Sequence, residues 1–151
     1  YQTETDPEIK DDILYTLIDI AKQPEHLEQL LAWLEQPKIV RPQNHIFLFA
    51  HLMRNYRTRD RALDWLVTHW DYVEQLTGEK SIEDYPRLAA TTLRTPAEAE
   101  KFYNFFDKMS DNPVLSRTLK IAHTDIDARL ALIAKDSAGV HEKLKELVKG
   151  E

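Results

Sequence analysis

Residues 55–71 read NYRTRDRALDWLVTHWD, and this stretch predicts an amphipathic helix that packs into a helical core. Thr58 can cap the helix by accepting a backbone N–H, and Asp60 suits the positive end of the helix dipole. Apolar side chains then recur at helical spacing, so that two tryptophans point into a core rather than towards a ligand. The predicted buried face consists of Ala62, Trp65, Leu66, Trp70, Val73 and Leu76.

Prolines mark the starts of further helices along the chain. Proline costs nothing at the first helical position, because the N–H that it lacks has no partner there. Thr95 and Glu98 form a capping box around one of these starts. The starts lie about one short helix plus one turn apart, as antiparallel helix pairs require. The five predicted starts are Pro7, Pro24, Pro42, Pro96 and Pro113.

The apolar pattern predicts helices and no strand. Residues 46–53 are apolar nearly all round, and we interpret them as a buried central helix. The longest helix is expected over residues 113–136; Gly139 then turns the chain, and a last helix begins near Val140. The prediction is a single all-α domain over residues 1–151, with about eight helices in antiparallel pairs that form a short HEAT-like superhelix.

Composition argues against several classes of function. The formal net charge is −6 at pH 7, which disfavours general nucleic-acid binding, although four arginines between residues 54 and 61 form a local basic cluster. The chain has no cysteine, which excludes disulfides and thiolate metal sites and fits a cytoplasmic location. No apolar run approaches the roughly 20 residues that span a bilayer, so we expect no membrane contact. The first residue is Tyr1 rather than Met, which suggests a piece of a longer protein.

The pattern within residues 55–71, Asn-x-x-x-Arg-x-x-Ala-x-Asp-aromatic-Leu/Val-x-x-x-Trp-Asp, resembles the helical C-terminal domain of aminopeptidase N-type zinc aminopeptidases. This domain also occurs in endoplasmic-reticulum and puromycin-sensitive aminopeptidases. Similar landmarks continue in the family's order through most of the chain after residue 40. They are Val40-Arg41-Pro42-Gln43-Asn44, Thr95-Pro96-Ala97-Glu98, Phe105-Phe106 and Arg117-Thr118-Leu119. The chain departs from the usual family residues at Asn44, Thr58, Leu63 and His69.

The resemblance implies zinc chemistry in the parent enzyme and none in this chain. The parent enzymes bind zinc through His-Glu-x-x-His with a distant Glu, and hold the substrate amine with Gly-x-Met-Glu-Asn; neither motif occurs here. The nearest approach begins His141-Glu142, but Lys145 replaces the second histidine, so we interpret it as a solvated helix edge. We expect no catalytic residue, metal ligand or cofactor in this chain. His69 and His123 are interpreted as partly buried histidines with local hydrogen bonds.

Arg41, Arg54 and Arg59 are the candidate contact residues, because they flank the predicted central helix. Family members place this domain like a bowl over the catalytic cleft. If the resemblance holds, guanidinium groups on its concave side could pair with a peptide carboxylate or with acidic residues of the catalytic domain. The alternative is a solvated or helix-capping arginine cluster, since surface arginine is common.

The leading hypothesis is a non-catalytic C-terminal domain of a cytoplasmic zinc aminopeptidase. Its partners would be the catalytic domain of the same polypeptide and the peptide substrate, with no nucleic acid and no membrane. It would wall the cleft, limit entry to unfolded peptides and be inactive alone. The alternative is a freestanding HEAT-like module that holds a partner helix or an acidic peptide. A third idea, nucleic-acid binding by the basic cluster, would require strong salt dependence.

Overall fold

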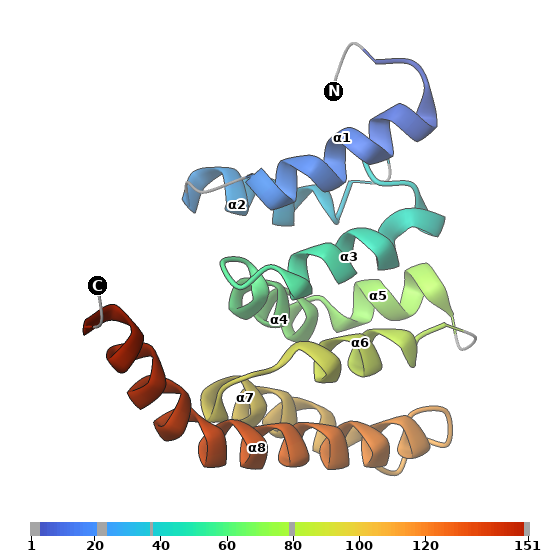
Figure 1. Ribbon diagram of the computed structural model, residues 1–151. Coiled ribbons are helices and arrows are strands. Elements are labelled where there is room, and N and C mark those ends of the chain that lie inside the picture. Colours follow the sequence, from blue (N-terminus) through green and yellow to red (C-terminus); the bar gives the residue numbers. More distant parts are fainter. Residues whose placement is uncertain (1–3, 21–23, 37, 79–80, 150–151) are drawn as a thin grey trace.

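The computed structural model describes residues 4–20, 24–36, 38–78 and 81–149, and the helices in these ranges stack in layers from α1 to α8 (Figure 1). They include eight α-helices and no strand, which confirms the predicted all-α fold, whereas the HEAT-like superhelix stays a prediction. The α-helices are α1 (Pro7–Ile20), α2 (Pro24–Trp33), α3 (His45–Arg54), α4 (Arg59–Thr68), α5 (Trp70–Thr77), α6 (Asp84–Thr92), α7 (Pro96–Phe106) and α8 (Ser116–Lys149). Two short 3₁₀ helices are η1 (Pro42–Asn44) and η2 (Asp107–Met109).

Three of the five proline starts are confirmed, those of α1, α2 and α7. At Pro42 the chain first makes η1, and α3 begins at His45. Pro113 lies in a turn before α8, where the Asn112 Oδ1 accepts a hydrogen bond from the Val114 N–H at 2.9 Å. The asparagine side chain thus stabilises a turn at the position where we expected the first helical residues.

The predicted central helix is confirmed in α3. Its buried residues contact α1 on one side and α4 and α6 on the other. Phe47 is the exception to the all-round burial expected from the sequence, with 58% of its surface exposed. One apolar core runs through the whole stack, from Leu14 of α1 to Ile126 of α8. The single domain over residues 1–151 stays a prediction.

Residues 55–71 form two helices instead of one, which corrects the sequence-based expectation. The helix is interrupted at His69, whose φ of −115° and ψ of 26° are not helical. The His69 Nδ1 lies 3.0 Å from the Trp65 carbonyl oxygen, and the Thr68 hydroxyl donates to the Asp64 carbonyl at 2.8 Å. Such local side-chain bonds compete with the helix ladder. Trp65 and Trp70 are nevertheless both buried, as predicted.

Thr58 does not cap α4, which is a second correction. Its hydroxyl donates to the Leu52 carbonyl near the end of α3, and no side-chain cap bond forms at α4. Thr58 is fully buried, with a φ of −104° and a ψ of −19°, whereas a capping residue normally has an extended conformation. The residue therefore fastens the α3–α4 turn to α3.

Gly139 does not turn the chain, because α8 continues through it to Lys149 as one 34-residue helix. Residues 131–147 are all exposed, so no tertiary contact imposes a turn there. A single helical glycine costs only about 1 kcal/mol relative to alanine, and its flanking residues are mostly good helix formers. No helix in the described part of the chain is long and apolar enough to cross a membrane.

His45 opens α3 as a buried polar residue among aromatic rings. Its Nδ1 lies 2.7 Å from the Tyr85 hydroxyl oxygen, and its ring centroid lies 5.5 Å from that of Trp65. Its Nε2 is buried as well. Burial lowers the pKa of His45 from 6.5 to about 4 and raises the pKa of Tyr85. His45 is therefore neutral in the folded protein at neutral pH.

We predict that the free energy of unfolding falls as the pH drops from 6.5 towards 4. In this window the unfolded chain protonates His45 while the folded chain does not, so the unfolded state gains stability, by up to roughly 3 kcal/mol. Urea unfolding across this pH range should show a weaker dependence in a His45→Gln variant than in the parent chain. His26→Gln, at an exposed residue, is the control and should leave the pH profile of the parent unchanged. Identical profiles for His45→Gln and the parent would contradict the prediction.

Candidate functional site

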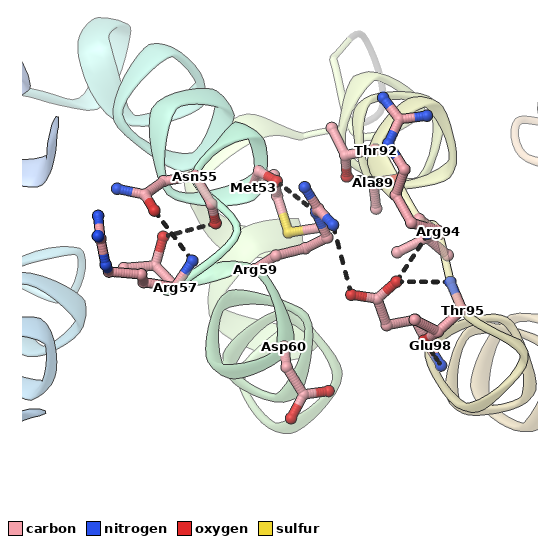
Figure 2. Close-up of polar contacts among 12 residues, drawn as sticks. Met53, Asn55, Arg57, Arg59, Asp60, Ala89, Thr92, Arg94, Thr95 and Glu98 are labelled. Atoms are coloured by element: carbon pink, nitrogen blue, oxygen red, sulfur yellow. Dashed lines mark hydrogen bonds and ion pairs between the residues drawn. The ribbon is translucent and has the colours of Figure 1, made fainter. Parts of the chain in front are cut away.

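Arginines gather at one end of the helix stack, where α3 and α6 end and α4 and α7 begin. We call this the arginine end and define it by Arg54, Arg57, Arg59 and Arg94. Arg54 is the last residue of α3, and Arg94 follows the end of α6. Figure 2 shows the side chains of Arg57, Arg59 and Arg94 in this region. A guanidinium group cannot act as a proton-transfer catalyst at physiological pH, so the arrangement is suited to binding anions.

Arg59 is the internal member of the arginine end. Its Nε donates to the Met53 carbonyl at 3.1 Å, and its Nη1 lies 3.7 Å from the Glu98 Oε1 (Figure 2). The Arg59 and Glu98 side chains are only 12% and 11% exposed. Arg59 thus connects the end of α3 and the start of α4 to α7.

Glu98 is shared between this ion pair and the capping box of α7. Its Oε2 accepts hydrogen bonds from the Arg94 N–H at 2.7 Å and the Thr95 N–H at 3.0 Å. The Thr95 hydroxyl oxygen in turn accepts from the Glu98 N–H at 3.2 Å. These contacts confirm the predicted capping box. They also hold the Arg94 backbone in place.

The outward part of the arginine end consists of Arg54, Arg57 and Arg94. All three residues are exposed, and none of their guanidinium groups has an ion-pair partner within the described ranges. The Arg57 guanidinium carbon lies 4.6 Å from the ring centroid of Tyr56, which is itself 70% exposed. The exposed Arg57 guanidinium beside the accessible Tyr56 ring can accept a carboxylate and an apolar group together.

Arg41 lies away from the other two candidate residues. It precedes α3 while Arg54 ends it, and a ten-residue helix separates its two ends by about 15 Å. The Arg41 Nη2 lies 2.6 Å from the Asp11 Oδ2, an oxygen that also accepts from the Asn44 side chain. Arg41 therefore joins the segment before α3 to α1. The structure brings Arg54 and Arg59 together and leaves Arg41 at the opposite end of α3.

Arg94 is the member of the arginine end that sequence reasoning missed. It stands directly before Thr95 and Glu98, so the capping box was the available signal. A capping box fixes the backbone of the residues at a helix start, and it therefore also fixes where the preceding side chain begins. Its proximity to residues 54–59 depends on the packing of α7 against α4, which the sequence does not reveal.

The histidines form no metal centre in the described residues, where no group of three or more His, Cys, Asp or Glu side chains is arranged to hold a metal ion. The His69 Nε2 lies 3.3 Å from the Glu35 Oε1, and the His123 Nε2 lies 2.7 Å from the Asp107 Oδ1. Both histidines are partly buried, which confirms their interpretation as locally bonded residues.

Comparison with known proteins identifies the family of this helical stack. A model described as the ERAP1-like C-terminal domain matches residues 1–128. The chain belongs to this family. Aminopeptidase N of Lactococcus lactis subsp. lactis (strain IL1403) is 28% identical to this ERAP1-like domain over 131 residues, which make up 86% of the chain and 16% of that protein.

Two further relatives show the same relation. Aminopeptidase N of Lactobacillus delbrueckii subsp. lactis is 25% identical over 142 residues, covering 93% of this chain and 17% of the relative. Aminopeptidase N of Lactobacillus helveticus is 24% identical over 149 residues, covering 98% and 18%. The ERAP1-like domain therefore spans less than a fifth of the length of these relatives, and the resemblance seen in the sequence is confirmed.

We predict that Arg59→Ala destabilises the domain by about 3 kcal/mol, because it leaves the buried Glu98 carboxylate without its cation. Arg61→Ala is the matched control, two residues along the same helix. Its ion pair with Glu28 joins side chains that are 50% and 53% exposed, so we expect a loss below about 1 kcal/mol. Urea unfolding measures both variants, and equal losses would show that Arg59 contributes no more than a surface pair.

Proposed function

We propose that this chain is the non-catalytic C-terminal domain of a zinc-dependent aminopeptidase. The observation that carries the proposal is the family match over residues 1–128, combined with relatives named aminopeptidase N of which the chain covers 16–18%. A segment of this size in such an enzyme leaves most of the polypeptide to provide the catalytic part. The parent enzyme would remove N-terminal residues from peptides.

The zinc of the parent enzyme does not fit the residues of this chain. The sequence lacks His-Glu-x-x-His, and the closest segment has Lys145 where the second imidazole would be needed. The described residues hold no group of three candidate ligands. We therefore assign no step of hydrolysis to this domain, and its zinc-binding residues are expected in the catalytic domain of the same polypeptide.

The proposed role of the domain is to form one wall of the substrate cleft and to dock on the catalytic domain. The outward cations Arg54, Arg57 and Arg94 supply a surface that can pair with acidic residues of that domain or with the carboxylate of a peptide. Arg59 supports this surface from inside, because its contacts fix the turn that carries Arg57. A reducing, cytoplasmic compartment agrees with the absence of cysteine.

The full reading frame that contains this chain tests the assignment directly. We expect it to encode His-Glu-x-x-His and a more distant Glu ahead of Tyr1, and we expect the purified 151-residue chain alone to release no p-nitroaniline from aminoacyl-p-nitroanilides with added zinc. A reading frame without that motif would favour the freestanding interaction module. Zinc-dependent turnover by the chain alone, retained after repurification, would overturn the non-catalytic role.

In the full-length enzyme, the triple variant Arg54→Ala, Arg57→Ala, Arg94→Ala tests the peptide contact. If these cations bind the substrate carboxylate, KM for an unblocked peptide should rise about tenfold, and KM for its C-terminal amide should not change. Arg87→Ala is the control, because Arg87 is an exposed arginine of α6 that pairs with Asp84 near the other end of that helix. An unchanged KM for both peptides would leave domain docking as the only role of these arginines. Weaker docking would then appear as separation of the domain from the catalytic domain at a lower temperature than in the parent enzyme.

A further inference from the structure

The last part of α8 has no partner within the described structure. We call residues 130–147 the α8 extension; Leu130 at its start is partly buried against the core, and the exposed residues follow it. In Figure 1 the last turns of α8 rise away from the layered helices, and every residue from 131 to 147 is exposed. Its exposed apolar residues have between 36% and 69% of their surface accessible. They are Leu132, Ile133, Val140, Leu144 and Leu147.

Most of these residues continue the stripe that buries the first part of α8. Leu119, Ala122 and Ile126 face the core, and the spacing then proceeds through positions 130, 133, 137, 140, 144 and 147. From residue 130 onward the steps alternate between three and four residues, which is the a/d pattern of a coiled coil. The a positions are Leu130, Ser137 and Leu144. The d positions are Ile133, Val140 and Leu147. A helix with such a seam is suited to pairing with another helix of the same kind.

We propose that two copies of this chain pair through their α8 extensions in antiparallel orientation. In an antiparallel coiled coil, a residues of one helix meet d residues of the other. Leu130 then faces Leu147 of the second copy, Ile133 faces Leu144, and Ser137 faces Val140. Every stripe residue has a partner, and all layers except that of Ser137 are apolar on both sides.

Charge complementarity favours a second copy of this chain as the partner of the α8 extension. It also favours the antiparallel orientation. Asp136 and Lys143 both flank the stripe on the same side, at the positions that face each other in an antiparallel pair. The pairing sets Asp136 opposite Lys143 of the second copy, and symmetry repeats the contact. In the single chain Lys143 pairs at 2.8 Å with Glu146, but both side chains are more than 60% exposed, so this bond is weak enough to be exchanged.

A parallel pair fits the same residues less well. It would place Ser137 against Ser137 of the second copy and Asp136 beside His141, and Lys143 would gain no acidic partner. It would also bring both helix stacks to the same end of the paired helices. The antiparallel pair puts the two stacks at opposite ends of a segment of about 27 Å, where they do not compete for space.

Two aspartate variants test whether the stripe forms the interface. Leu144 and Leu132 are 55% and 57% exposed on the same helix, but only Leu144 lies on the stripe. Sedimentation of the 151-residue chain should show a concentration-dependent dimer whose Kd rises at least tenfold in Leu144→Asp and stays near the parent value in Leu132→Asp. Circular dichroism should show that both variants remain folded, since neither residue is in the core. Equal effects of the two variants, or a monomer at every concentration, would overturn the proposal.

Cross-linking tests the orientation, because the chain has no cysteine of its own. A mixture of Leu130→Cys and Leu147→Cys chains should form a mixed disulfide on oxidation, and neither variant should cross-link to itself. In the antiparallel pair, positions 130 of the two copies lie about 25 Å apart, which is too far for a disulfide. Self-cross-linking of Leu130→Cys would establish the parallel arrangement and overturn the register.

A charge exchange provides an independent check of the register. Asp136→Lys alone should weaken the dimer, and adding Lys143→Asp to the same chain should restore it, because the two contacts are then reversed in sign. If the double variant is no tighter than the single one, the two residues do not face each other. If the full-length protein has a buried α8 extension and sediments only as a monomer, the extension docks within its own polypeptide and the proposal is wrong.

Discussion

The arginine end depends on the hydrogen bonds and the ion pair that the Glu98 carboxylate makes. One of its oxygens accepts two backbone N–H groups before α7, and the other faces the Arg59 guanidinium. Arg59 extends this connection to the Met53 carbonyl at the end of α3. Four helix ends thus converge on one ion pair and its hydrogen bonds. The outward arginines stand on the turns that this arrangement fixes.

Burying such a pair is costly in general, because two charges leave water and their mutual attraction does not always compensate. Here the carboxylate is compensated by more than the arginine. The N–H groups at a helix start have no partner within the helix, so they need an acceptor in any case. Glu98 supplies that acceptor and pairs with Arg59 at the same time. An apolar pair of equal volume would fill the space between α4 and α7 and leave those donors without an acceptor.

The features that sequence reasoning predicted are local ones. The capping box at Thr95 depends on residues three apart, and the burial of Trp65 and Trp70 follows from their helical spacing. The break at His69 was missed because two side chains compete for carbonyl groups there, and periodicity does not register that competition. The sequence predicts a turn at Gly139, but residues 131–147 make no packing contact that would favour a turn over the continuing helix. The Arg59–Glu98 pair joins distant parts of the chain and became visible only in the folded structure.

Helix dipoles favour the positions of two charged residues in the stack. Glu8 lies in the first turn of α1 and Arg54 in the last turn of α3, the positions where an acid and a base are favourable. The two helices run in the same direction, because Asp11 and Arg41 meet at one end and the Asn55 side chain donates to the Ile18 carbonyl at the other. Glu8 and Arg54 therefore lie at opposite ends of two parallel helices, each where its own helix dipole favours its charge. A net charge of −6 describes the whole chain, but an acidic partner that approaches the arginine end meets a local positive field, which orients docking more than it strengthens it.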